Sequence, residues 1–219
     1  PNAGLSYVNL HTVKADPANF DPNRLDIFRY CIFAWDHGYT PTLSGRAEGP
    51  GGAPSNDFFV SLANRIPDGA RADLQTGTFL HELGHTLGLQ HGGNITANSK
   101  DNYNSVMHYG NGWIVWAGQW NKYSPSQWGG VDTDCNLLNV NAVYTYSQGM
   151  RADLDENDLD EDAGVCDGLD RDWNGNNVIE NPVQQNLDRV AALDVISDYA
   201  DWANIELNFR VPGSDWGGN

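Results

Sequence analysis

The sequence predicts an α/β (α+β) fold in which a twisted sheet has a backing helix and a second helix above it. Three observations lead to this fold class. Segments rich in strand-forming residues stand at 5–13, 42–48 and 57–63. Apolar residues at helical spacing occupy 21–38 and about 70–90. The remainder of the chain is rich in polar and turn residues, so we expect an irregular lower part there.

The composition limits the partners that the chain can bind. Its 219 residues suffice for one core, or for two lobes that share a cleft. The net charge of −17 and the pI near 4.4 argue against nucleic-acid and anionic-membrane partners, because phosphate groups would be repelled. The acidic excess has three interpretations: a solvated surface of a secreted or salt-adapted protein, a set of calcium ligands, or an attractive field for basic substrates. No apolar run is long enough to span a bilayer. The start at Pro1 indicates a processed form or an excised domain.

The N-terminal segments are predicted to form a first strand and the backing helix. Residues 5–13 alternate imperfectly between apolar and polar, which favours a strand with both faces partly covered. Asp21 and Pro22 form a helix N-cap followed by a first-turn proline. The residues at helical spacing that follow are Leu25, Phe28, Ile32 and Trp35, with Cys31 beside them as a buried small hydrophobe.

Four further segments carry weaker patterns. Residues 42–48 and 57–63 are predicted to be strands joined by a glycine- and proline-rich loop, and 205–209 a closing strand. The acidic run 154–161 is predicted to form a turn of amphipathic helix, with its two leucines facing inward and its carboxylates in solvent.

The strongest pattern lies in the second predicted helix. On an α-helix, His81 and His85 stand one turn apart on the same face, so both imidazoles can reach one ion. Glu82 lies beside that face, where it can hold a metal-bound water without binding the metal itself. An apolar stripe of leucines can bury the opposite side of the helix and fix it on a core.

The residues after this helix complete a set of three ligands. Gly88 can end the helix in a left-handed conformation that a residue with a Cβ would resist. The chain then turns, and His91 returns as the third ligand. Three neutral nitrogens leave the fourth zinc position to water, which is the arrangement of a catalytic site.

The pattern His-Glu-x-x-His-x-x-Gly-x-x-His resembles that of the metzincin metallopeptidases. The resemblance implies a secreted, monomeric zinc endopeptidase with protein or peptide substrates. It also implies a single two-lobed catalytic domain over 1–219, with an upper lobe at about 1–91 and a lower lobe at about 92–219. In such enzymes the substrate adds to a strand at the cleft edge, for which 42–48 and 57–63 are the candidates.

A second motif supports this resemblance. Ser-Val-Met-His-Tyr-Gly at 105–110 is similar to the methionine-containing turn that lies beneath the zinc in metzincins, with Met107 as a soft apolar floor. Tyr109 takes the position of the astacin and serralysin tyrosine that stabilises the oxyanion. Gly92, directly after His91, departs from astacins, which have a glutamate there. The aromatic residues after Gly110 either wall a substrate pocket or fill the lower core.

These motifs predict peptide hydrolysis with Glu82 as general base for zinc-activated water. Two alternatives stay open. One is a non-catalytic, calcium-stabilised extracellular binding module that has inherited the site. The other is a zinc hydrolase that acts on a non-protein amide.

A polar segment near the C-terminus predicts a calcium site. Asp170, Asp172 and Asn174 place oxygen side chains at alternate positions before Gly175, as in loops that wrap Ca²⁺. Glu180 falls one position short of the usual closing carboxylate, so the loop is either a modified calcium loop or a plain Asx-turn loop. This stretch and 198–204 are similar to the endings of large secreted bacterial metzincin-like proteins. Cys135 and Cys166 either form a disulfide or are free.

Overall fold

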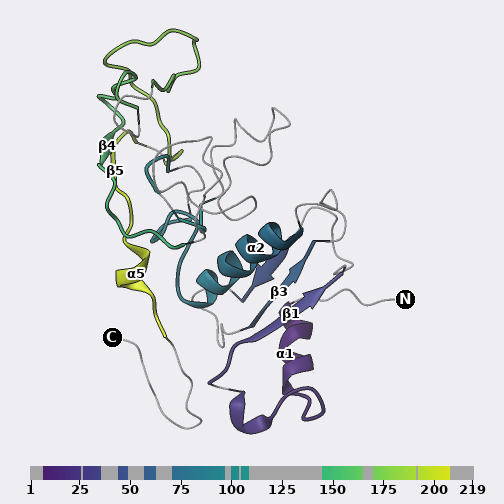
Figure 1. Ribbon diagram of the computed structural model, residues 1–219. Helices are drawn as coiled ribbons and strands as arrows, with labels where there is room; N and C mark the ends of the chain where they lie inside the picture. The colour runs from purple at the N-terminus through teal and green to yellow at the C-terminus, as the bar shows by residue number, and fades with distance from the viewer. Residues whose placement is uncertain are drawn as a thin grey trace. The chain divides into compact units, whose positions relative to one another are not determined.

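A computed structural model of the chain is a mixture of α and β structure, with few helices and small sheets in the part that it describes (Figure 1). The described residues are 7–25, 27–35, 44–48, 57–62, 71–96, 100–103, 105–108, 145–164, 170–190 and 192–207. Two compact units divide the chain: unit 1 is Pro1–Leu89 with Ile205–Asn219, and unit 2 is Gln90–Asn204.

The sheet of unit 1 has a fully buried central strand. Its order is β1 (Tyr30–Ala34), β3 (Asp57–Ser61) and β2 (Gly45–Ala47). Strand β1 runs parallel to β3, and β2 runs antiparallel to it. All residues of β3 are buried, which suits its aromatic and β-branched sequence.

Two helices pack on this sheet from opposite faces (Figure 1). Helix α2 (Arg71–Thr86) lies on β3 and β2. Its Phe79 contacts Phe58 of β3 and Phe33 of β1, with ring centroids 5.3 Å and 6.0 Å apart. Helix α1 (Tyr7–Ala15) lies on the other face of β3. None of the helices in the described residues has the length and apolar character needed to cross a membrane.

Lys14 and Asp57 form a buried ion pair that fixes α1 to the sheet. Lys14 Nζ donates to Asp57 Oδ1 at 2.8 Å, and the two side chains are 1% and 0% exposed. The same ammonium donates to the Phe28 carbonyl at 2.8 Å and lies 5.5 Å from the centroid of the Phe20 ring. Asp57 Oδ1 also accepts the backbone N–H of Tyr30 at 3.2 Å. One carboxylate therefore joins a helix, the central strand and its parallel neighbour.

The strand prediction for 5–13 is wrong, because most of this segment belongs to α1. Its described buried side chains are Leu10 and Lys14, which stand at i and i+4 on one helical face. A prediction from hydrophobicity places Lys14 at the surface, whereas in the structure it is buried and paired with Asp57.

The backing helix predicted after Asp21 is also wrong. Asp21 does accept the Asn23 N–H at 2.9 Å as an N-cap, but the helix is only the 3₁₀ turn η1 (Pro22–Arg24), and strand β1 follows. Phe28 and Trp35, two members of the predicted helical stripe, are 50% and 67% exposed. The spacing of a short apolar run is compatible with both a helix and a strand. Pairing with β3 stabilises the strand here.

The predictions for the middle of the chain hold better. Strands β2 and β3 lie within the predicted 42–48 and 57–63, and α2 lies within 70–90. Of the closing strand predicted at 205–209, the described residues 205–207 form no strand.

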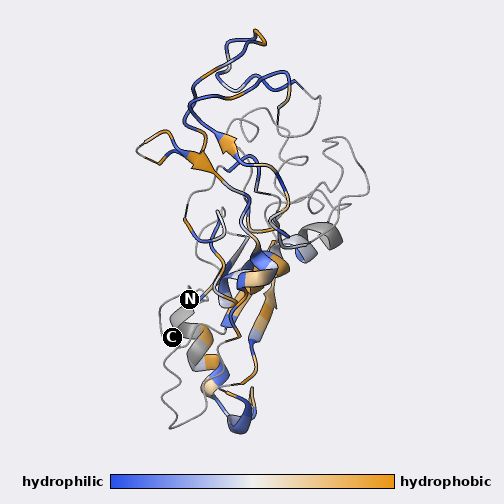
Figure 2. Cartoon of the chain, turned by 90° about the vertical axis from the view of Figure 1, so that its left-hand side faces the viewer, coloured by the Kyte–Doolittle hydropathy of each residue, from blue (hydrophilic) through white to orange (hydrophobic). Residues whose placement is uncertain are grey.

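Unit 2 contains short elements joined by long loops. Strand β4 (Leu154–Asp155) pairs antiparallel with β5 (Val195–Ile196), and α5 spans Asp201–Asn204. In Figure 2 the loops of this unit are mostly hydrophilic, whereas hydrophobic residues gather on strands. A described hydrophobic cluster consists of Leu159, Trp173, Val183, Leu187 and Ile196, with Leu154 packed against it.

Two buried carboxylates order the loops of unit 2. Glu156 and Glu161 are both 0% exposed, and each accepts three backbone N–H groups from a later loop. The donors to Glu156 are Leu187, Asp188 and Asp194, and those to Glu161 are Trp173, Asn174 and Glu180. The predicted solvated helical turn at 154–161 is therefore wrong, although Leu159 is buried as expected.

Replacing Lys14 by methionine is expected to destabilise the protein by about 3–5 kcal/mol, because Asp57 would keep a buried charge without its partner. Arg24→Met is the matched control, since the Arg24–Asp21 pair spans 3.7 Å with side chains 60% and 49% exposed. Surface pairs of this kind contribute less than about 1 kcal/mol. Chemical denaturation measures both free energies of unfolding, and equal losses would contradict the role of the buried pair.

Candidate metal centre

The end of α2 determines where the chain goes after its two histidines. The helix stops at Thr86, and Gly88 takes a φ of +91°. The Leu89 N–H donates to the Gly84 carbonyl at 3.0 Å, which closes the helix end. Arg29 donates to both the hydroxyl and the carbonyl of Thr86, at 2.8 Å and 3.0 Å. The predicted left-handed turn at Gly88 is confirmed.

His91 lies in a tight turn immediately after this reversal. Gln90 and Gly93 exchange both backbone hydrogen bonds, at 2.8 Å and 3.0 Å. His91 and Gly92 are therefore the central residues of the turn. The Gly92 carbonyl accepts a hydrogen bond from Lys100 Nζ at 3.2 Å. Backbone contacts on both sides thus hold the third histidine.

The three histidines of the motif can hold one metal ion. One ring nitrogen from each of His81, His85 and His91 lies within 4.8 Å of the others. The Nε2 atoms of His81 and His85 are 3.2 Å apart. Two nitrogens bound at about 2.0–2.1 Å to one tetrahedral ion stand about 3.3 Å apart, so this pair has the spacing that zinc needs. The donor set therefore fits the zinc that the sequence predicts.

His85 has a defined tautomer. Its Nδ1 lies 2.9 Å from the Leu89 carbonyl oxygen, which only accepts, so Nδ1 carries the proton. Nε2 then presents a lone pair towards His81. Burial lowers the pKa of His85, although the bond to Leu89 opposes this shift. The ring is therefore neutral at pH 7, as a metal ligand must be.

The Glu82 carboxyl is buried against strand β2. The residue is 5% exposed and accepts a hydrogen bond from the Ala47 backbone N–H. A Cβ placed at Gly45 would lie 2.6 Å from Glu82 Oε1, so the close approach of the strand requires glycine there. Burial raises the pKa of Glu82 to about 8, against the opposing effects of the Ala47 hydrogen bond and the Arg46 charge. The carboxyl thus lies between α2 and an edge strand of the sheet.

Cys31 is half-buried on β1 with a free thiol. Burial, and to a lesser extent the Glu82 charge, raises its pKa to about 12. The thiol therefore stays protonated at neutral pH.

Residues 105–108 form the turn that the sequence predicts around Met107. The His108 N–H donates to the Ser105 carbonyl at 3.0 Å, and the Met107 N–H donates to Ser105 Oγ at 3.1 Å. Met107 is 0% exposed. The predicted residues that lie outside the described ranges are Tyr109, the aromatic residues after Gly110, Cys135 and Cys166.

His108 is a buried neutral imidazole. It is 7% exposed, its Nε2 has no hydrogen-bond partner among the described residues, and its ring centroid lies 6.1 Å from that of Tyr103. Burial lowers its pKa to about 4, and the charges of Lys100 and His91 act in the same direction.

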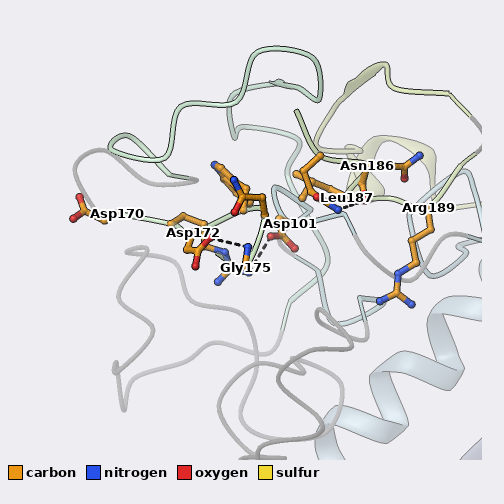
Figure 3. Close-up of a pocket in the computed structure, with 11 residues that line it drawn as sticks. Asp101, Asp170, Asp172, Gly175, Asn186, Leu187 and Arg189 are labelled. Carbon is orange, nitrogen blue, oxygen red and sulfur yellow. Dashed lines mark hydrogen bonds and ion pairs between the residues drawn. The ribbon is translucent and has the colours of Figure 1, made fainter. Parts of the chain in front are cut away.

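The polar loop near the C-terminus brings together two of its three predicted ligands. The Asp172 carboxylate accepts three of the backbone N–H groups that follow it. The Nδ2 atoms of Asn174 and Asn176 both donate to Glu180 Oε1, at 3.0 Å and 2.9 Å. The third predicted ligand, Asp170, points away from Asp172 (Figure 3).

This loop also lines a cavity of about 400 Å³ (Figure 3). Arg171 pairs with Asp101 at 3.0 Å and lies 5.4 Å from the centroid of the Trp173 ring. Leu187 and Arg189 line another part of the wall. Charges of both signs surround the cavity, so it favours no single class of ligand.

Sequence reasoning missed three residues that order these sites. Asn176 continues the alternate spacing of Asp172 and Asn174, which is the signal that could have included it. Glu156 and Glu161 each end a copy of the tripeptide Leu-Asp-Glu. That short repeat could have indicated equivalent surroundings for the two glutamates.

Comparison with protein-family models, with curated proteins and with solved structures finds no match to this chain. The assignment of a function therefore depends on the residues and geometry of the chain itself.

Replacing His108 by phenylalanine is expected to reduce the stability lost on acidification. The folded-state pKa of about 4 is below the ordinary value of 6.5, so the unfolded chain binds more protons between these two values. The contribution of His108 is complete above about pH 6.5 and is lost as the pH falls towards about 4. Denaturation of the metal-free proteins near pH 7 and near pH 5 measures the difference. Identical pH dependence in wild type and variant would show that His108 is not a buried neutral imidazole.

Proposed function

We propose that this chain is a secreted, zinc-dependent endopeptidase with the two-lobed metzincin fold. The proposal is based on three histidine nitrogens that lie within 4.8 Å of one another. Beside them in the sequence, directly after His81, stands the buried Glu82. Three nitrogen ligands leave one position for water, as in catalytic zinc sites. The buried Met107 in its turn adds support through the metzincin resemblance.

His81, His85 and His91 are the residues that would hold zinc. Zinc, when bound, supplies a Lewis acid that polarises a carbonyl and makes water more acidic. The Leu89 carbonyl keeps His85 in the tautomer that presents Nε2, and the turn after α2 carries His91.

Strand β2 is the strand to which we assign the substrate. Of the two strands predicted as candidates, β3 is central in the described sheet and β2 is at its edge. An extended peptide forms hydrogen bonds with the free side of an edge strand, whereas β3 is paired with a strand on both sides. The Ala47 N–H of β2 donates to Glu82, so a peptide along β2 would pass close to this carboxyl.

Glu82 acts as the general base. Burial raises the pKa of Glu82 to about 8, so the charge of a bound zinc ion would have to favour the carboxylate over the protonated form at pH 7. That carboxylate would take a proton from the attacking water and then give it to the leaving amine. Because the residue is 5% exposed, bulk water has little access to the proton during the transfer. Tyr109 would stabilise the oxyanion, a role that comes from the resemblance to astacins and serralysins.

Glu82→Gln is expected to keep zinc and to lower kcat about 10²–10⁴-fold, because glutamine has nearly the same shape but cannot accept the proton. Peptide hydrolysis and zinc content are measured on the same preparation. His91→Ala is the control for the metal, since it removes a ligand and should lower zinc affinity. Near wild-type turnover in Glu82→Gln would exclude this mechanism.

The two alternatives give different results with a peptide library. Glu82 argues against a non-catalytic binding module, because such a module has no use for a base beside three histidines. Cleavage at defined bonds that stops when a chelator is added supports the endopeptidase. An intact library with zinc fully bound favours the binding module or a hydrolase of a non-protein amide.

We also propose that Ca²⁺ binds in the loop at 172–180. The amides of Asn174 and Asn176 converge on one oxygen of Glu180, and Asp172 begins the loop. The Oδ1 atoms of the two asparagines accept the backbone N–H groups of Asn176 and Val178, at 2.9 Å and 2.7 Å. A bound cation would therefore replace some of the hydrogen bonds of this loop, with oxygens of Asp172, Asn174 and Glu180 as its ligands. Carboxylate and amide oxygens at alternate positions are the ligands that Ca²⁺ prefers. A plain Asx-turn loop, the alternative, explains these hydrogen bonds without a cation.

Added Ca²⁺ is expected to raise the melting temperature of the zinc-loaded protein. At a Ca²⁺ concentration of a hundred times Kd, the free energy of unfolding rises by about 2.7 kcal/mol. Glu180→Gln should abolish this increase because it removes the charge on which both amides converge. Asp170→Asn is the matched control, since Asp170 points away from the loop (Figure 3). A calcium effect that survives in Glu180→Gln and disappears in Asp170→Asn would contradict this set of ligands.

A further inference from the structure

The segment Asp198–Asp201 contacts two turns of unit 2. One carries His91 of the candidate metal centre. The other is the turn of Met107, where His108 is close enough to His91 for the His91 charge to lower its pKa. Both turns lie far from this segment in sequence, so their contacts with it are purely tertiary.

Tyr199 packs directly on the turn of His91. A Cβ built at Gly93 would lie 2.3 Å from Tyr199 Cδ1, so the ring touches the backbone with no space for a side chain. Gly93 closes the turn through its two hydrogen bonds with Gln90, and its φ is +82°. The Tyr199 ring therefore limits how far the turn can move.

Lys100 supports the same turn by contact with the backbone carbonyl of Gly92, a central residue of the turn. The side chain is 5% exposed, and its Nζ donates to the Gly92 carbonyl at 3.2 Å. The carboxylates whose charges act on this ammonium are, from the strongest, Asp198, Asp188, Asp201 and Asp153. A buried ammonium requires counter-charges of this kind, so the segment also stabilises the Lys100 contact.

Asp201 binds the turn of Met107. The residue is 0% exposed, its Oδ1 accepts the Tyr103 hydroxyl at 2.6 Å, and its Oδ2 accepts the Ser147 N–H at 2.9 Å. The carboxylate also forms a hydrogen bond with the Ser105 side chain. Ser105 Oγ in turn accepts the Met107 N–H at 3.1 Å. One carboxylate therefore holds the first residue of the turn.

We propose that Tyr199 and Asp201 are positioning residues, which set the affinity and coordination of the metal centre by holding these two turns in place. This inference rests on the proposed function, and it assigns the position of the third ligand to a distant segment of the chain.

His91 depends on such contacts more than the other two ligands do. Helix α2 places His81 and His85 through its own geometry, whereas His91 lies beyond the helix end. Replacing residues that support a metal ligand typically changes metal affinity 10–100-fold. Loss of the contacts from Asp198–Asp201 should therefore release His91 and leave the two helical histidines in place.

Asp201→Asn is the first test variant, because asparagine keeps the size of the side chain and removes its charge. Glu161→Gln is its matched control: Glu161 is also 0% exposed and also accepts backbone N–H groups in unit 2, but from residues 173–180. Tyr199→Ala removes the ring from Gly93, and Tyr199→Phe retains it. The full chain is stripped of metal and titrated with Zn²⁺ in competition with a chelator. The absorption spectrum of bound Co²⁺ then reports the nitrogen ligands, with no substrate present.

Asp201→Asn and Tyr199→Ala are expected to weaken Zn²⁺ binding about 10–100-fold and to shift the Co²⁺ spectrum towards that of His91→Ala. Glu161→Gln and Tyr199→Phe should keep the wild-type spectrum and affinity, even where stability falls. If circular dichroism shows that Asp201→Asn does not fold, the comparison of Tyr199→Ala with Tyr199→Phe decides.

Wild-type spectra and affinities in both Asp201→Asn and Tyr199→Ala would overturn this inference and leave the proposed function intact. Equal weakening in Glu161→Gln would also overturn it, because a general loss of stability would then explain the effect. A wild-type chain that binds neither ion would overturn the proposed function, and this inference with it.

Discussion

The reversal of the chain after α2 is the constraint on which the candidate metal centre depends. A helix can bring only its own two histidines to one ion, because the next position on that face lies a further turn away. The φ of +91° at Gly88 and the paired hydrogen bonds of Gln90 and Gly93 return His91 to within 4.8 Å of their nitrogens. A helix that continued past Thr86 would direct the third imidazole elsewhere and leave only two nitrogen ligands.

Buried charges also organise each of the two units. In unit 1, Asp57 joins α1 to two strands through its pair with Lys14. In unit 2, Glu156 and Glu161 accept backbone N–H groups of later loops, and Asp201 accepts a hydroxyl and a backbone N–H. Several hydrogen bonds to each carboxylate offset its cost of burial. This explains how loops of mostly hydrophilic sequence can hold defined turns.

The errors of the sequence predictions have a common physical cause. Residues 5–13 and 30–34 are short segments whose apolar spacing fits a helix and a strand almost equally well. Contacts with β3 then decide each of them, and a local pattern does not contain those contacts. The polar loop shows the same limit, because its alternate oxygens are visible in sequence while the convergence of two amides on Glu180 appears only in the fold.

The sequence by itself determined the local part of the candidate site: the helical spacing of His81 and His85, and the glycine that ends their helix. Each depends on residues within one or two turns of chain, so spacing and conformational preference suffice to predict it. Only the tertiary structure decided that Glu82 lies under β2 and that the segment Asp198–Asp201 holds the turn of His91. These contacts join residues far apart in sequence, and a pattern of charges and apolar residues does not state which distant groups will meet.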